Sequence, residues 1–183
     1  YWWSDEWNPL DYGRDFDFAR SFFEQFQELW NVVPQPNLGT AYESLENSEY
    51  INYASFLKNC YLVFHATFCE DCYYSVGIKH SKNLVDCLHT YKSELCYECI
   101  NCRDCYNVRF SKNSQWCSDS WFLRVCISCK DCYGCVNLQQ KQYCIFNEQK
   151  TKEEYESYVH ALHLDEYAKL EDAKQKCAEF HTS

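Results

Sequence analysis

All fifteen cysteines of this 183-residue chain stand at residue numbers divisible by three, and thirteen of them lie between residues 60 and 135. This spacing differs from the period of two that a flat, half-buried strand shows. Side chains that point inward at every third position need a corner every few residues. The spacing therefore favours a narrow, rounded coil whose interior accepts only small side chains.

A repeat of 15 residues aligns residues 61–150 in six blocks, with a partial block at 46–60. One column of this alignment is cysteine in five blocks: Cys72, Cys87, Cys102, Cys117 and Cys132. Other columns exchange Cys with Ser, Thr and Ala, and another holds Tyr61, Tyr91, Tyr106 and Trp121, which we interpret as an aromatic ladder. Fixed columns of small residues are typical of solenoids, and a repeat this short cannot hold a pair of helices. We expect a mainly β fold, a β-solenoid of about six 15-residue coils.

Helical segments are expected on both sides of the repeats. Apolar side chains at helical spacing predict a helix within residues 15–33, which Pro34 and Pro36 would stop. Thr151 and Glu154 form a capping-box pattern that predicts a helix over 151–162, followed by another over roughly 165–180. The predicted division is an N-terminal helical or irregular cap at 1–45, the cysteine-rich solenoid at 46–150 and a C-terminal helical cap at 151–183.

The cysteines allow three interpretations. The first is packing, because free cysteine behaves as a small, often buried apolar residue and trades places with Ser, Thr and Ala in these columns. The second is disulfide formation, either between adjacent coils ~4.8 Å apart or within a coil. The candidate pairs within a coil are Cys96 with Cys102, Cys99 with Cys105, Cys126 with Cys132, and Cys129 with Cys135.

Metal or cluster binding is the third interpretation. The motif C-x2-C-x2-C-x2-C occurs twice, and its cysteines are the candidate ligands: Cys96, Cys99, Cys102 and Cys105, then Cys126, Cys129, Cys132 and Cys135. Four thiols on one coil can hold Zn, Cu(I) or an Fe–S centre, although the spacing differs from a ferredoxin run and from paired zinc knuckles. His65, His80 and His89 lack a third partner at ligand spacing, so we interpret them as packing residues.

The distribution of charge along the chain restricts which kinds of partner it can bind. Residues 1–50 hold ten acidic against two basic side chains, a net charge of −8, whereas residues 61–140 hold eight of each. The neutral centre argues against a nucleic-acid surface. No apolar run approaches the length needed to cross a bilayer, so we expect no membrane span. The chain contains no Met, so we expect a processed product or a fragment of a longer protein whose targeting segment is not visible here.

Two resemblances rest on particular segments. The inward Cys, Ser and Ala spacing resembles the small β-solenoids of the insect antifreeze type, but their Thr-x-Thr rows are missing here, so ice binding is not carried over. Most of the chain resembles uncharacterised cysteine-rich repeat proteins of candidate-phyla bacteria. The segments that carry this second resemblance are WWSDEWNPLDYGRDFDF (2–18), SELCYECINCRDCYN (93–107) and CVNLQQKQYCIFNEQ (135–149). It implies no activity.

The sequence therefore predicts a non-enzymatic structural protein without a catalytic residue or a resident cofactor. We expect a homo-oligomer, or a filament formed by end-to-end assembly of coils. The alternative is a metal- or Fe–S-binding protein that uses the two four-cysteine motifs.

Overall fold

The computed structural model describes residues 5–35 and 38–182, and the chain divides into two compact units, Tyr1–Gly39 and Thr40–Ser183. The first unit holds a 3-10 helix, Pro9–Tyr12, and the helix α1, Phe22–Val32. The predicted N-terminal helix thus exists but begins later than residue 15, because Gln25 hydrogen-bonds the backbone N–H and carbonyl of Asp17 and holds that segment in a turn. The apolar face of α1 is exposed, and Phe26 packs between Phe22 and Trp30.

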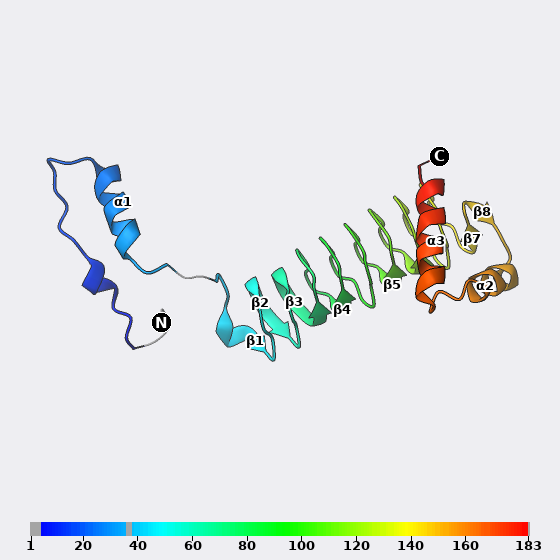
Figure 1. Ribbon diagram of the computed structural model, residues 1–183, viewed down its shortest axis with the longest axis horizontal. Coiled ribbons are helices and arrows are strands. Elements are labelled where there is room, and N and C mark those ends of the chain that lie inside the picture. Colours follow the sequence, from blue (N-terminus) through cyan, green and yellow to red (C-terminus); the bar gives the residue numbers. More distant parts are fainter. Residues whose placement is uncertain (1–4, 36–37, 183) are drawn as a thin grey trace. The chain divides into compact units, whose positions relative to one another are not determined.

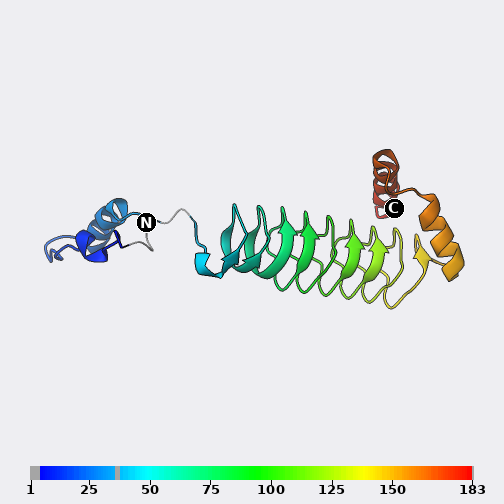
Figure 2. The same ribbon diagram turned by 90° about the horizontal axis from the view of Figure 1, so that it is seen from below.

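The second unit is a stack of parallel coils, which confirms the predicted β-solenoid (Figures 1 and 2). After a 3-10 turn at Tyr42–Ser44, its strands are short segments of a continuous ladder. They are β1 (Leu45–Glu46), β2 (Asn52–Lys58), β3 (Phe64–Tyr73), β4 (Lys82–Val85), β5 (Tyr106–Arg109) and β6 (Ser118–Trp121). Isolated parallel bridges continue the ladder between and beyond them.

The coils repeat with a step of twelve along the chain, so the expected 15-residue coil is wrong. Asn52 pairs with Phe64, and Phe64 pairs with Val76. The same step of twelve carries a ladder without a break from Glu49 to Ile145. Because twelve is four times three, four triplets close one coil and each triplet contributes one inward side chain.

The backbone repeats every three residues. From Asn47 to Phe146, every third residue has a positive φ, including Gly77 at 69° and Gly134 at 65°. The residue after it points into the core, as the burial pattern of β3 illustrates, except near the C-terminal end of the stack, where Lys141 is exposed. A left-handed residue in each triplet turns the chain sharply, which is why the coil closes within four triplets.

The C-terminal end carries a hairpin and two helices. Strands β7 (Cys144–Ile145) and β8 (Glu148–Gln149) pair antiparallel, and α2 (Lys152–Ala161) and α3 (Tyr167–Phe180) follow. The predicted capping box of Thr151 and Glu154 is present. Figures 1 and 2 show α2 at the end of the coil stack and α3 beside its last coils.

A second apolar cluster holds these two helices against the solenoid. Its buried members are Phe122, Tyr133, Ile145, Tyr155, Ala173 and Cys177. None of the helices in the described residues is long and apolar enough to cross a bilayer. The division of the chain at residues 45 and 150 stays a prediction.

Candidate functional site

The four-triplet coil places the four cysteines of each motif in one turn. Because inward positions recur every three residues, Cys96, Cys99, Cys102 and Cys105 provide all four core side chains of a single coil. Cys126, Cys129, Cys132 and Cys135 do the same farther along the stack. All eight side chains are at most 2% exposed. The structure therefore brings together the residues of each predicted site as a buried layer of four thiols.

The predicted column of five cysteines does not exist. Its members are separated by fifteen residues, which is one coil plus one triplet, so each lies on the next side of the solenoid. They are Cys72, Cys87, Cys102, Cys117 and Cys132. Cysteines that do stack are separated by one whole coil, such as Cys105, Cys117 and Cys129. The predicted aromatic ladder is wrong for the same reason, since Tyr91 and Tyr106 lie on other sides than Tyr61 and Trp121. Rings stack with a step of twelve elsewhere, in Phe56, Phe68 and His80 and in the pair Phe110 and Phe122.

Inward serines complete the backbone hydrogen bonds of the coil. In each triplet, one N–H bonds forward to the next coil, as Val76 does to the Cys87 carbonyl at 2.9 Å, and one bonds backward, as Gly77 does to Phe64. The N–H of the inward residue remains. In Cys87 it donates to Oγ of Ser75, one coil earlier, at 3.1 Å. Ser81, Ser93, Ser111, Ser114 and Ser120 accept in the same way.

Inward cysteines hydrogen-bond the backbone mainly as donors, through carbonyls of their own coil and of the next one. The Cys99 thiol donates to the Tyr97 and Val108 carbonyls at 3.5 and 3.2 Å. The Cys72 thiol and, to a smaller extent, the Cys72 backbone N–H hydrogen-bond the Cys60 sulfur one coil earlier and lower its pKa to about 7. Many inward positions thus hold a small side chain with a polar γ atom, while others hold an aliphatic residue such as Val63, Ile78 or Leu84. Among the polar ones, the buried hydroxyl of Thr90 has no hydrogen-bond partner within the described residues.

Neighbouring thiols also shift the pKa values of one another. The pKa of Cys105 is raised by its hydrogen bond to Cys102 and by burial, and the pKa of Cys99 is raised mainly by its bond to Cys102. Cys102 receives these bonds, so its pKa is lowered. Cys129 has the equivalent place in the other layer, where Cys117, one coil earlier, and the layer neighbours Cys126 and Cys132 lower its pKa.

All fifteen cysteines are free thiols, so the proposed disulfide pairs are not formed in this structure. Among the described residues, no group of three or more His, Cys, Asp or Glu side chains is arranged to hold a metal ion. His65, His80 and His89 have positive φ values on the outside of the coil. His80 stacks on Phe68 with ring centroids 5.1 Å apart, which agrees with its interpretation as a packing residue.

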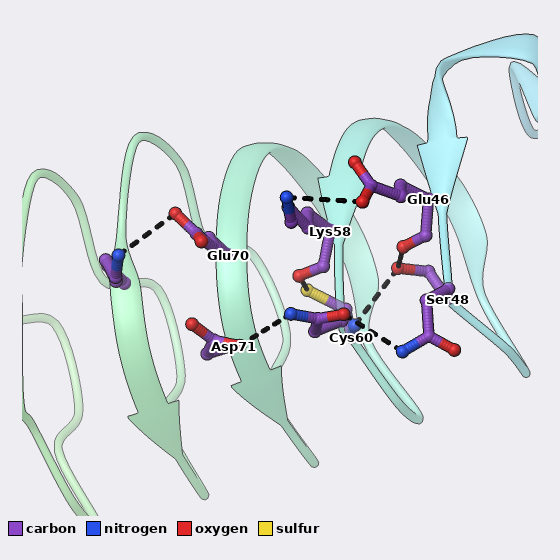
Figure 3. Close-up of polar contacts among 9 residues, drawn as sticks. Glu46, Ser48, Lys58, Cys60, Glu70 and Asp71 are labelled. Atoms are coloured by element: carbon purple, nitrogen blue, oxygen red, sulfur yellow. Dashed lines mark hydrogen bonds and ion pairs between the residues drawn. The ribbon is translucent and has the colours of Figure 1, made fainter.

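Polar ladders on the outer surface were missed by the sequence reasoning (Figure 3). Lys58 pairs with Glu46 at 3.2 Å, and Lys82 pairs with Glu70 at 3.1 Å, one coil apart in each case. Beside them, the Asn59 amide donates to Asp71 at 3.0 Å. The signal was present as alternating charge at a spacing of twelve, in Glu46, Lys58, Glu70, Lys82 and Glu94.

The fold and its core define the class of this protein as a β-solenoid with a cysteine-rich interior. A scan against protein-family models finds no match, and a search of curated proteins finds no similar sequence. The functional assignment therefore depends on the coil and its side chains.

Proposed function

We propose that this protein is a non-enzymatic structural β-solenoid whose cysteines serve the packing and hydrogen bonding of a narrow core. The observation that carries the proposal is the shared role of Ser and Cys. Either γ atom donates to the carbonyl two residues earlier and also hydrogen-bonds the backbone of the next coil, where Ser accepts from an N–H and Cys donates to a carbonyl. Buried thiols of this kind are poor nucleophiles, because catalytic cysteines need access to a substrate and an electropositive environment. The balanced charge of residues 61–140 supports the absence of a nucleic-acid partner.

The ends of the stack bear on the proposed self-assembly. At the C-terminal edge, the Asn147 side chain accepts from the Val136 N–H at 2.9 Å and donates to the Val136 carbonyl at 3.1 Å, as a further coil would do. The Lys150 N–H and the Gln149 amide occupy the carbonyls of Tyr143 and Gln142. At the other edge, β1 is the outermost strand of its sheet.

We therefore propose that copies associate through the edge at β1 and that intact chains stop at a dimer. A filament needs two open edges, so it requires displacement of the β7–β8 hairpin. Sedimentation velocity over a hundredfold range of concentration tests this proposal. A reversible dimer that is lost when lysine replaces the exposed Asn47 beside β1 supports it, because a charged side chain on an edge strand opposes pairing with another chain. Monomers at every concentration, with no filaments by electron microscopy, would contradict it.

Metal binding is a second candidate, favoured by the convergence of four thiols in one coil. Cys102 and Cys129 are the sulfurs on which neighbouring S–H groups favour negative charge. The thiols fit a soft ion such as Zn, Cu(I) or the iron of an Fe–S centre by donor type, but their S–H groups would have to leave the carbonyls that they now contact. Elemental analysis after anaerobic purification tests this candidate. One metal per four-cysteine layer supports it, and less than one per chain contradicts it.

The resemblance to cysteine-rich proteins of candidate-phyla bacteria agrees with a cysteine-rich solenoid at the level of fold. We propose membership in that group as a hypothesis, and it adds no activity to the structural role.

A further inference from the structure

A cavity of about 400 Å³ lies between α3 and the coils that it crosses. Three polar contacts fix the helix there. Lys174 pairs with Glu98 at 3.2 Å, Arg124 donates to the His181 carbonyl at 3.2 Å, and the His181 ring bonds the Gly134 carbonyl at 3.3 Å. The volume is within the range of small-molecule sites.

The cavity combines apolar side chains with two cations on adjacent coils. Phe110 and Phe122 line its apolar part. Lys112 and Arg124 line the same cavity and are direct neighbours in the parallel ladder, so their charges lie one coil apart. Like charges directly opposite each other in a sheet are destabilising.

Within the described residues, no other two cations are direct neighbours in the ladder, although acidic residues lie one coil apart at Asp119 and Asp131. In another row the charges alternate in sign, with Lys58 against Glu46 and Lys82 against Glu70. Within residues 5–35 and 38–182, neither Lys112 nor Arg124 lies within ion-pair distance of a carboxylate. The one acidic residue that lines the cavity, Glu98, is paired with Lys174.

We propose that this cavity binds a small organic anion, a carboxylate or phosphate attached to an aromatic or otherwise planar apolar group. Lys112 and Arg124 hold the oxyanion, and the guanidinium retains N–H groups beyond the one that Arg124 gives to His181. The apolar group packs on Phe110 and Phe122. This binding site goes beyond the proposed structural role and does not depend on it.

Titration of the full chain with benzoate, phenyl phosphate and inorganic phosphate, followed by NMR chemical shifts, tests the proposal. We expect saturable shifts with one of the two aromatic anions, centred on the cavity, and their order of affinity identifies the oxyanion. Lys112→Gln and Arg124→Gln should each weaken binding at least tenfold. Lys130→Gln removes the same charge from another side of the solenoid and should leave the affinity unchanged.

Two results would overturn the proposal. One is the absence of saturable shifts up to 10 mM of every probe, and the other is an equal affinity for phenyl phosphate and inorganic phosphate, since the apolar side chains would then contribute nothing. Lys112→Glu gives an independent measurement. It should raise the melting temperature of the ligand-free protein, by restoring alternating charge, while abolishing the shifts. A lowered melting temperature with unchanged binding contradicts the proposal.

Discussion

At the scale of single residues, the coil depends on two positions in each triplet, the left-handed residue and the inward residue after it. Asn and Asp suit the first position, because their short polar side chains tolerate positive φ. Asparagine at this position can also hydrogen-bond between coils, as the Asn101 amide does when it donates to Asn113 at 3.0 Å. Ser and Cys suit the second position for the hydrogen bonds that their γ atoms make.

Val125 is a strained member of a polar row. It has a φ of 56°, a value that β-branched residues avoid, and it lies one coil after Asn113 and one coil before Asn137. Val125→Asn should stabilise the protein by about 1 kcal/mol, by relieving strain and extending the amide ladder. Chemical denaturation measures the change. Val76→Asn, at an exposed position without positive φ, is the control and should give no gain.

Ser120 tests the role of the inward γ atom. Its hydroxyl accepts from the Cys132 N–H at 3.0 Å and donates to the Ser118 carbonyl at 2.7 Å. Ser120→Ala should cost about 1–3 kcal/mol, because a buried N–H loses its acceptor. Ser120→Cys should cost less. Equal losses in the two variants, measured by denaturation against Ser128→Ala on the surface, would mean that volume alone matters.

At the scale of elements, the position of α3 depends on a missing side chain. A Cβ at Gly134 would lie 2.7 Å from a ring carbon of Phe146 and 3.3 Å from the Cys177 sulfur. Gly77 has nearly the same φ, but a Cβ there would meet only the exposed ring of His89, which can move. Substitutions at the two glycines therefore distinguish the cost of backbone strain, which both share, from the cost of disturbed packing against α3, which only Gly134 has.

Alanine at these two glycines gives a matched comparison. Gly77→Ala should cost about 1 kcal/mol from the positive φ alone. Gly134→Ala should cost about 2–4 kcal/mol, because overpacking adds to the strain. Hydrogen exchange should show faster opening of the α3 amides in Gly134→Ala only. Equal exchange in both variants would contradict the packing of α3 against this row.

His181 makes the attachment of α3 sensitive to pH. Burial lowers its pKa from the ordinary value, and the charge of Arg124 lowers it further, while the Gly134 carbonyl opposes the shift. The folded protein therefore favours the neutral ring, so its stabilising effect is complete above about pH 6.5 and is lost as the pH falls.

Melting temperatures between pH 5 and 8 test this predicted direction of the pH dependence. The wild-type chain should lose stability on acidification more steeply than His181→Gln, which keeps an N–H donor but does not titrate. Parallel curves for the two proteins would show that His181 contributes nothing to the pH dependence.

The sequence could predict the class of coil but not its length. Any period that is a multiple of three keeps Cys and Ser inward, so a coil of four triplets and a coil of five triplets satisfy the core equally well. Only the outer surface distinguishes the two coil lengths, because the alternating charges of Glu46, Lys58 and Glu70 recur every twelve residues. The start of α2 was predictable from the capping box of Thr151, whereas the docking of α3 depends on Gly134 and its neighbours in space.

At the scale of the whole molecule, the solenoid unit combines a core of thiols with an outer surface of ladders. The same coil geometry explains the spacing of the four-cysteine motifs without a metal or a disulfide, because four inward residues make up one turn. Disulfides or a metal would change the mass of the chain in different directions. One observable therefore distinguishes the structural proposal from its alternatives.

Native mass spectrometry of the chain, purified without oxygen, is the most direct test. Packing predicts a mass equal to that of the polypeptide with fifteen free thiols, in a monomer or a dimer. A mass raised by bound metal, or lowered by about 2 Da for each disulfide, would contradict the proposal that these cysteines serve packing alone.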